Sequence, residues 1–162
     1  MLIISEQAKI SKLAHIEDSV RGTKIIIEKG VVIDSFVRIK PVGGMGDVII
    51  GANTHINSGT VIFSGNGIRI GENVLISPGC VLVPVNHEYR ARDKTIIEQR
   101  FMPSRGGIVI GDDVWIGANS TILDGTVIGK GVVIGANSLV KGELEAYCVY
   151  AGNPLKQIGR RA

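Results

Sequence analysis

The stretch IGDDVWIGANSTILDGTVIGKGVVIGANSLV, residues 110–140, consists of six-residue blocks that each begin with Ile or Val. The fifth place of each block holds a small or β-branched residue, and Gly fills the second place in most blocks. A period of six fits neither an α-helix, with about 3.6 residues per turn, nor one long alternating strand. It fits a short strand followed by a turn in which Gly, Asn and Asp are favoured.

The same register extends upstream, where the blocks come in groups of three. The spacing is six within each group, and irregular gaps follow Ile39, Ile62 and Leu82. Every interruption therefore falls at the same corner of a three-sided coil. The opening residues of these upstream blocks are Ile27, Ile33, Ile39, Ile50, Ile56, Ile62, Ile70, Ile76 and Leu82.

Internal repeats of this length predict a solenoid of stacked coils. Strands of successive coils pair about 4.8 Å apart, and the opening Ile or Val of each block fills a narrow interior. Such an interior has no room for rings, in keeping with 4% aromatic residues beside 44% hydrophobic residues. We predict an all-β fold, a parallel β-helix of three-sided coils, as a single domain over residues 1–162. A long loop over 87–107 projects from it, and a short cap over 145–162 closes its C-terminal end.

Composition limits what the chain does. No run of about 18 apolar residues occurs, and the first residues lack the layout of a secretion signal, so we expect a cytoplasmic chain without a membrane span. Cys80 and Cys148 form no CxxC pair, which argues against a zinc site or a disulfide framework. A net charge of +3 with scattered basic residues suits a small anionic ligand better than nucleic acid.

The longest interruption begins in VPVNHEYRARDK, residues 83–94, and contains His87. A loop of this length inside a compact repeat is usually functional or disordered. A histidine at the rigid edge of a solenoid, facing a polar loop, is well placed to act as a general base near neutral pH. We therefore predict that His87 is catalytic.

Three segments carry a resemblance to a known family: NH at residues 86–87, GGIVIGDDVWIGANSTIL at 106–123 and VYAGNPLKQI at 149–158. Together they resemble the hexapeptide-repeat acyltransferases, and among these the sugar O-acetyltransferases of polysaccharide assembly and the galactoside and maltose acetyltransferases. The resemblance implies a left-handed β-helix, a homotrimer with active sites between subunits, and acetyl-CoA as co-substrate with no metal required. It also implies direct transfer to a sugar hydroxyl, with His87 as the base.

The resemblance suggests further site residues. It assigns Asn57 to the acceptor sugar, and Glu98 is a second acceptor-site candidate and the first choice as a partner that orients the imidazole. Glu88, Asp93 or a backbone carbonyl would serve that role as well. The resemblance places the cofactor contacts at Trp115, Gly117, Ala118, Ala136, Lys141 and Lys156.

Within that last group the expected roles differ. Trp115 would line the channel for the pantetheine arm, and the small residues would let backbone groups meet the pantetheine amides. Lys141 and Lys156 would meet the phosphates of coenzyme A. Related enzymes often have TK where this chain has Lys141 and Gly142, so the residue that contacts the phosphates stays open.

Several alternatives remain open at the level of sequence. An amine on an amino sugar or another small molecule is an alternative acceptor, and charged residues of the loop suggest an anionic or nucleotide-linked sugar. A zinc carbonic anhydrase of the same fold would need three histidines in one site, yet His15 is far away in coil order and no two of His15, His55 and His87 are spaced to share a site. A scaffold that only binds or assembles is the third alternative.

Overall fold

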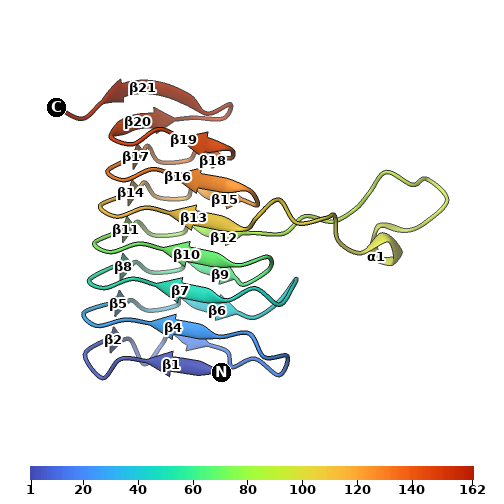
Figure 1. The fold of residues 1–162 in the computed structure, drawn as a ribbon, viewed down its shortest axis with the longest axis horizontal. Helices are drawn as coiled ribbons and strands as arrows, with labels where there is room; N and C mark the ends of the chain where they lie inside the picture. Colours follow the sequence, from blue (N-terminus) through green and yellow to red (C-terminus); the bar gives the residue numbers. More distant parts are fainter.

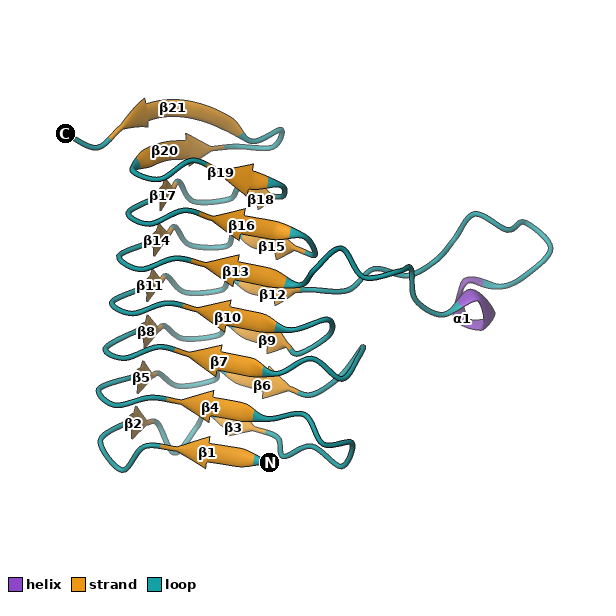
Figure 2. Ribbon diagram, in the orientation of Figure 1, coloured by secondary structure: helices purple, strands orange, loops and turns teal.

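The computed structural model describes residues 1–162, which form a three-sided prism of stacked coils with one long arm (Figure 1). Each coil contributes one short strand to each side, and turns form the corners. Figure 2 shows that the only helix lies in the arm, so the prism itself is built from strands and turns. The predicted all-β fold is confirmed.

Three sheets form the sides of the prism, and all strand pairs within the coils are parallel. The first sheet contains β1 (Leu2–Ile4), β4 (Ile25–Ile27), β7 (Val48–Ile50), β10 (Ile68–Ile70), β13 (Ile108–Ile110), β16 (Thr126–Ile128) and β19 (Glu143–Leu144). The second sheet contains β2 (Lys9–Ile10), β5 (Val32–Ile33), β8 (His55–Ile56), β11 (Leu75–Ile76), β14 (Trp115–Ile116), β17 (Val133–Ile134), β20 (Cys148–Ala151) and β21 (Lys156–Arg160). The third sheet contains β3 (His15–Ile16), β6 (Arg38–Lys40), β9 (Val61–Phe63), β12 (Val81–Val83), β15 (Thr121–Leu123) and β18 (Leu139–Val140).

The coils wind in a left-handed sense. In Figure 1 the chain rises from the N-terminus at the bottom to the C-terminus at the top, while the strands of the nearer first sheet point from right to left. A viewer who looks down from the C-terminal end sees the chain come closer while it turns clockwise. A helix that turns clockwise as it approaches the viewer is left-handed. The handedness implied by the resemblance is therefore confirmed.

The interior is filled by the residues that open the six-residue blocks. Ile33, Ile76 and Ile116 are at most 1% exposed, and the other block-opening residues from Ile27 onward are equally buried. No aromatic residue belongs to the core cluster. The narrow aliphatic interior expected from the composition is thus observed.

All interruptions of the repeat lie where a strand of the third sheet leads to the next strand of the first sheet. We call this edge of the prism the loop corner. The irregular segments at this corner are residues 17–24, 41–47, 64–67 and 84–107. The last of them leaves the prism as an arm that carries α1 (Ile96–Gln99) far from the coils (Figure 1). The insertion therefore leaves the strand ladders intact below and above it.

The C-terminal end of the prism is covered by the chain itself. Strand β21 runs back antiparallel to β20, with Ala151 opposite Lys156 and Cys148 opposite Arg160. The only helix has four residues, and no helix of this chain could cross a membrane.

The core predicts a sharp contrast between two Ile→Ala substitutions. Ile76 is 0% exposed inside the prism, whereas Ile97 is 86% exposed on α1. We expect Ile76→Ala to lower the free energy of unfolding by about 2–5 kcal/mol, because it leaves a cavity in a packed core. Ile97→Ala should change it by less than about 0.5 kcal/mol. Chemical denaturation of both variants checks this, and equal effects would contradict the assignment of the core.

Candidate active site

The loop leaves the prism through a short two-stranded stem. His87 and Phe101 form an antiparallel bridge. The stem is closed by hydrogen bonds from Met102 N to Asn86 O at 2.9 Å and from Glu88 N to Arg100 O at 3.0 Å. Backbone bonds on both sides thus hold His87 within a few residues of β12, although its side chain is exposed.

The imidazole of His87 is oriented by a backbone carbonyl. Its Nδ1 lies 3.2 Å from the carbonyl oxygen of Arg100. A carbonyl can only accept a hydrogen bond, so Nδ1 carries the proton and Nε2 keeps its lone pair. The ring also packs against Phe101, with centroids 4.8 Å apart and planes tilted by 40°. When the ring is neutral, this arrangement leaves Nε2 as its basic nitrogen.

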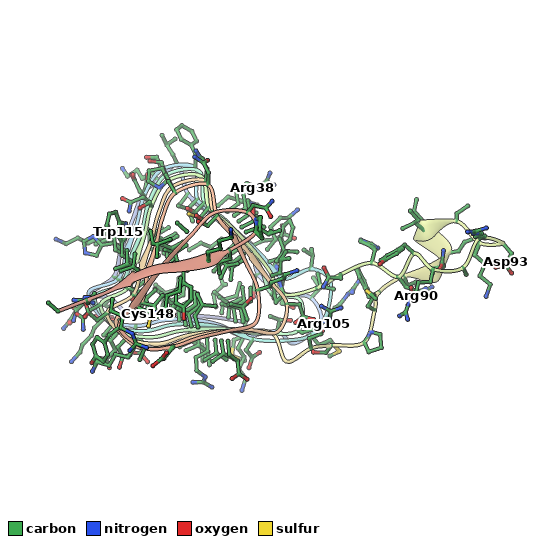
Figure 3. All side chains as sticks on the ribbon, turned by 90° about the horizontal axis from the view of Figure 1, so that it is seen from above. Arg38, Arg90, Asp93, Arg105, Trp115 and Cys148 are labelled. Atoms are coloured by element: carbon green, nitrogen blue, oxygen red, sulfur yellow. The ribbon has the colours of Figure 1, made fainter.

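The acidic residues of the loop are engaged elsewhere. Glu88 binds Arg90 at 2.7 Å, and hydrogen bonds from the Arg90 side chain and from the backbone of Arg90 and Tyr89 lower the pKa of Glu88 to about 2. Glu98 bonds Thr95 in the capping box of α1. Asp93 lies at the far end of the arm (Figure 3). Of the orienting groups considered from sequence, the backbone carbonyl is the one that contacts His87.

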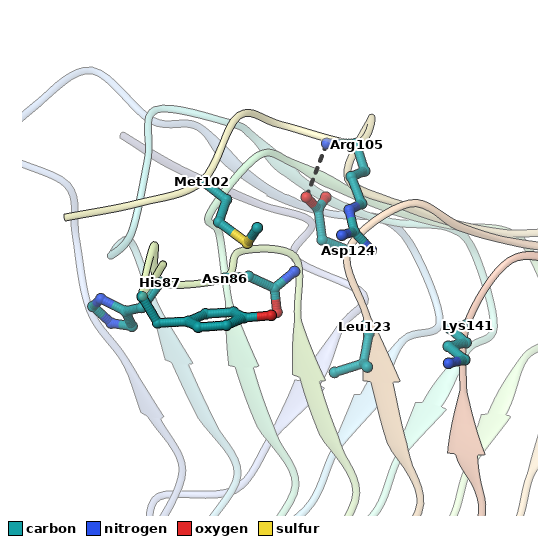
Figure 4. A pocket seen from close by; sticks show the side chains of 8 residues that line it. Asn86, His87, Met102, Arg105, Leu123, Asp124 and Lys141 are labelled. Carbon is teal, nitrogen blue, oxygen red and sulfur yellow. Dashed lines mark hydrogen bonds between the residues drawn. The ribbon is translucent and has the colours of Figure 1, made fainter. Parts of the chain in front are cut away.

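A cavity of about 380 Å³ opens beside the stem at the loop corner. Figure 4 shows His87 and Lys141 at opposite ends of it. The cavity carries two cationic side chains, those of Arg105 and Lys141, which take part in no ion pair. Its lining includes Asn86, His87, Arg105, Leu123, Asp124 and Lys141.

Asp124 ties the returning end of the loop to the prism. Asp124 is buried, with only 4% of its surface exposed. One carboxylate oxygen accepts from Gly107 N at 2.9 Å, and the other accepts from Arg105 N at 2.9 Å and from Asn66 Nδ2 at 3.1 Å (Figure 4). Because these donors are uncharged N–H groups, the Arg105 guanidinium stays available to the cavity.

The cofactor candidates Gly117, Ala118 and Ala136 lie at another edge of the prism, the corner between the second and third sheets. Gly117 N donates to Ile134 O at 2.7 Å, which stacks this turn directly on the next. A Cβ at Gly117 would lie 2.5 Å from Ala136 N, so the close approach of the two coils alone requires glycine.

The same corner also carries Asn57 and Lys156 at the two ends of the column. Asn57 donates from N and from Nδ2 to Ile76 O, at 3.0 and 2.8 Å. Lys156 on β21 lies opposite Ala151 in the antiparallel β20–β21 pair, and Ala151 in turn stacks on Gly135 of the preceding coil. The column therefore runs along the prism from the acceptor candidate to a cation at its C-terminal end.

Trp115 projects from the second sheet and is 48% exposed. Its Nε1 donates to Ser77 Oγ at 3.0 Å, which turns the indole toward the corner column. Figure 3 shows Trp115 on the side of the prism away from the arm. Asp124 follows Ala118 by six positions, so the column and the cavity lie at most about 20 Å apart across one side of the prism. Within a single chain, His87, Glu98 and Lys141 therefore lie apart from the site candidates at the corner column.

The remaining histidines and the cysteines are placed differently. His15 lies on β3 and His55 on β8, both exposed on the prism surface. No group of three or more metal-ligating side chains comes together in this chain. Cys80 and Cys148 are free and buried, and burial raises the pKa of the Cys80 thiol. Neither thiol is set up as a nucleophile.

Sequence reasoning assigned no specific role to several residues around His87. Phe101 and the Arg100 carbonyl hold the imidazole, and Asp124 and Arg105 shape the cavity. For Asp124 the sequence did contain a sign of irregularity: the second place of its block, residues 122–127, holds Leu, whereas most neighbouring blocks have Gly there. The others are irregular loop residues without a positional pattern.

The prism and the site define a class, the hexapeptide-repeat left-handed β-helix with a histidine-bearing loop. A profile of the bacterial transferase hexapeptide family (six repeats) matches residues 107–142. Both the repeat and the whole-chain similarities described next agree with this class. The chain belongs to the hexapeptide-repeat transferases.

Two solved structures and one curated protein illustrate the similarity. An AntD N-acyltransferase mutant from Bacillus cereus, bound to dTDP-4-amino-4,6-dideoxyglucose and coenzyme A, is 28% identical with a TM-score of 0.82, covering 98% of this chain and 83% of that one. A maltose O-acetyltransferase from Clostridium difficile 630 is 26% identical with a TM-score of 0.66, covering 80% and 69%. Galactoside O-acetyltransferase from Escherichia coli (strain K12) is 36% identical over 116 residues, 69% of this chain and 53% of that protein.

The chain spans about half the length of curated relatives that it matches, 55% and 61% for two of them. Their full activities are therefore a basis for proposals about this chain.

The Asp124 anchor predicts how the loop responds when the carboxylate is removed. We expect Asp124→Ala to speed hydrogen exchange at the amides of Arg105 and Gly107 by at least about tenfold, because donors left without an acceptor cost about 1–3 kcal/mol. Asp93→Ala, at the exposed far end of the arm, is the control and should leave both amides protected. Unchanged exchange in Asp124→Ala would show that other contacts hold the returning strand.

Proposed function

We propose that this protein is an acetyl-CoA-dependent O-acetyltransferase that acts on a hydroxyl of a sugar or of a sugar-containing acceptor. The observation that carries the proposal is the contact of His87 Nδ1 with Arg100 O at 3.2 Å, which leaves Nε2 free to accept a proton. The similarity to galactoside and maltose O-acetyltransferases supports the acceptor class. Asn57 and Glu98 stay candidates for acceptor binding.

The reaction needs only one general base from the protein. His87 Nε2 removes the acceptor hydroxyl proton as the oxygen attacks the thioester carbonyl carbon. The tetrahedral intermediate then collapses, the C–S bond breaks, and the imidazolium returns the proton to the departing thiolate. The products are an acetyl ester and free coenzyme A, and no acyl-enzyme forms.

Coenzyme A would bind along the corner column. Ala118 is half-buried and Ala136 is exposed, so the Ala118 N–H and the backbone groups of Ala136 would meet the pantetheine amides, whereas buried Gly117 donates its N–H to Ile134 O and allows the turns to stack closely. Lys156 would meet a phosphate at the upper end of the column, because phosphate oxygens favour charged donors. Lys141 would supply a second cation from the cavity beside His87. We place the reaction in the cytoplasm, where buried free thiols such as Cys80 stay reduced.

A homotrimer would complete the site. The base lies at one corner of the prism and the cofactor column at another, so a neighbouring copy has to bring its column to this cavity. Apolar residues exposed on the prism surface support such packing: Leu75 is 42%, Val109 38% and Trp115 48% exposed. In this arrangement Trp115 of one copy lines the channel that ends at His87 of the next.

One observation favours a second candidate, N-acylation of an amino sugar. The AntD structure matches this chain over nearly its whole length, and that protein was solved with an amino sugar nucleotide and coenzyme A. The cationic side chains of Arg105 and Lys141 could bind the diphosphate of such an acceptor. The same base and the same cofactor site would carry out this reaction.

Replacement of the base tests the mechanism. We expect His87→Ala to lower kcat by about 10²–10⁴, because no other group can take the acceptor proton. Coenzyme A affinity, measured by calorimetry, and the oligomeric state should stay unchanged. His15→Ala, which removes an exposed imidazole on β3, is the control and should retain activity. Near-normal turnover in His87→Ala would overturn the assignment.

The acceptor class is tested by thiol release from acetyl-CoA against sugars, sugar nucleotides and amino sugars. We expect release with a hydroxyl acceptor, and a product that mild base cleaves, since esters hydrolyse and amides resist. A base-stable product would replace the main proposal with N-acylation. If no acceptor releases thiol and calorimetry detects no coenzyme A binding, the proposed function is wrong.

A further inference from the structure

Helix α1 lies in the arm, where it makes no contribution to the core, since none of its residues is buried. A four-residue helix is unstable without other support. Here a capping box supports it: Glu98 Oε2 accepts from Thr95 N at 2.8 Å and from Thr95 Oγ1 at 2.7 Å, and Thr95 Oγ1 accepts from Glu98 N at 3.4 Å. The helix is therefore fixed at its start by two side chains.

The end of the same helix is unusual. Its C-cap, Arg100, has φ 61° and ψ −130°, a conformation that residues with a side chain seldom adopt. Its N–H donates to Ile97 O at 3.3 Å, the last bond of the helix. This turn points the Arg100 carbonyl back toward the stem, where it accepts from Glu88 N and from His87 Nδ1.

We propose that α1 is a positioning element for His87, and that Glu98 is a positioning residue that acts through the Arg100 carbonyl. The capping box holds the helix, the helix holds Arg100 in its turned conformation, and the turned carbonyl keeps the proton of His87 on Nδ1. That His87 is the base rests on the proposed function. The choice of tautomer does not, because it follows from the contacts within the loop.

Nothing else near the ring replaces this carbonyl. The Glu88 carboxylate is held by Arg90, and Phe101 packs against the imidazole without offering an acceptor to Nδ1. If α1 frays, the bond from Arg100 N to Ile97 O is lost, and only the stem bond from Glu88 N still holds the Arg100 carbonyl. A carbonyl held from one side only shifts relative to the ring and releases Nδ1. The neutral imidazole then populates both tautomers, and in one of them Nε2 carries the proton and cannot act as a base.

The tautomer is read by NMR of protein with 15N-labelled histidine, without any substrate. We expect the Nδ1–H form to predominate at His87 in the wild type, and a mixture in Glu98→Ala and in Thr95→Ala. Glu98→Gln should keep the wild-type form, because Gln also completes a capping box. Asp93→Ala, which removes a carboxylate from the same arm outside the capping box, is the control and should leave the signals unchanged.

Kinetics of the same variants separate positioning from direct contact. Glu98→Ala should lower kcat by about tenfold or more with little change in either KM, and Glu98→Gln should recover most of the loss. Loss in Glu98→Gln together with a raised KM for the acceptor would show that the carboxylate binds the acceptor directly. An unchanged tautomer in both Glu98→Ala and Thr95→Ala would also overturn the proposal.

Substitutions at Arg100 test the turned peptide. Arg100→Gly keeps the carbonyl and tolerates a positive φ, so the tautomer should match the wild type. Arg100→Val disfavours this conformation and should give the mixed signals of Glu98→Ala. Equal tautomer populations in the Gly and Val variants would contradict the proposal. If no acceptor is acetylated at all, the function fails, yet the NMR result still decides whether α1 positions His87.

Discussion

Hydrogen bonds between successive coils place them about 4.8 Å apart, and the rest of the structure depends on this spacing. Inward positions accept slender aliphatic residues such as Ile76, which is 0% exposed, or small residues such as Ser120, and no aromatic residue belongs to the core. Turns stack so closely that a Cβ at Gly117 would lie 2.5 Å from the backbone of the next coil. Extra residues cannot enter a strand without breaking the ladders on both sides, so they gather at one corner, and the arm leaves from there.

The same constraint separates what is rigid from what is adaptable in the site. The coils supply a column of turns whose backbone is fixed by the ladder, which suits a long cofactor. The arm carries the proposed base, His87, close to where it leaves the prism, so that the stem and the Arg100 carbonyl hold the ring. The proposed cofactor column is therefore fixed by the coils, and the proposed base is oriented separately by contacts within the arm.

The fold could be predicted from sequence because the repeat has a strict register, and the break in that register marks the place of the candidate site. Block-opening residues such as Ile33 and Leu82 are buried as predicted, and the sixth-place residues His55 and Trp115 are exposed. The break in the rhythm singled out His87. Which group contacts the imidazole could not be predicted, because it is the backbone carbonyl of Arg100. The unusual φ that turns this carbonyl toward the ring cannot be inferred from the side chain of an arginine.

The central claim is that His87 and the cofactor column of a neighbouring copy form one site. A crystal structure of the protein with coenzyme A tests it directly. We predict a trimer in which the pantetheine arm follows the turns at Gly117 and Ala136 of one subunit and its thiol approaches Nε2 of His87 in the next, with Nδ1 on the Arg100 carbonyl. Coenzyme A bound within a single chain, or a thiol distant from His87, would contradict the account.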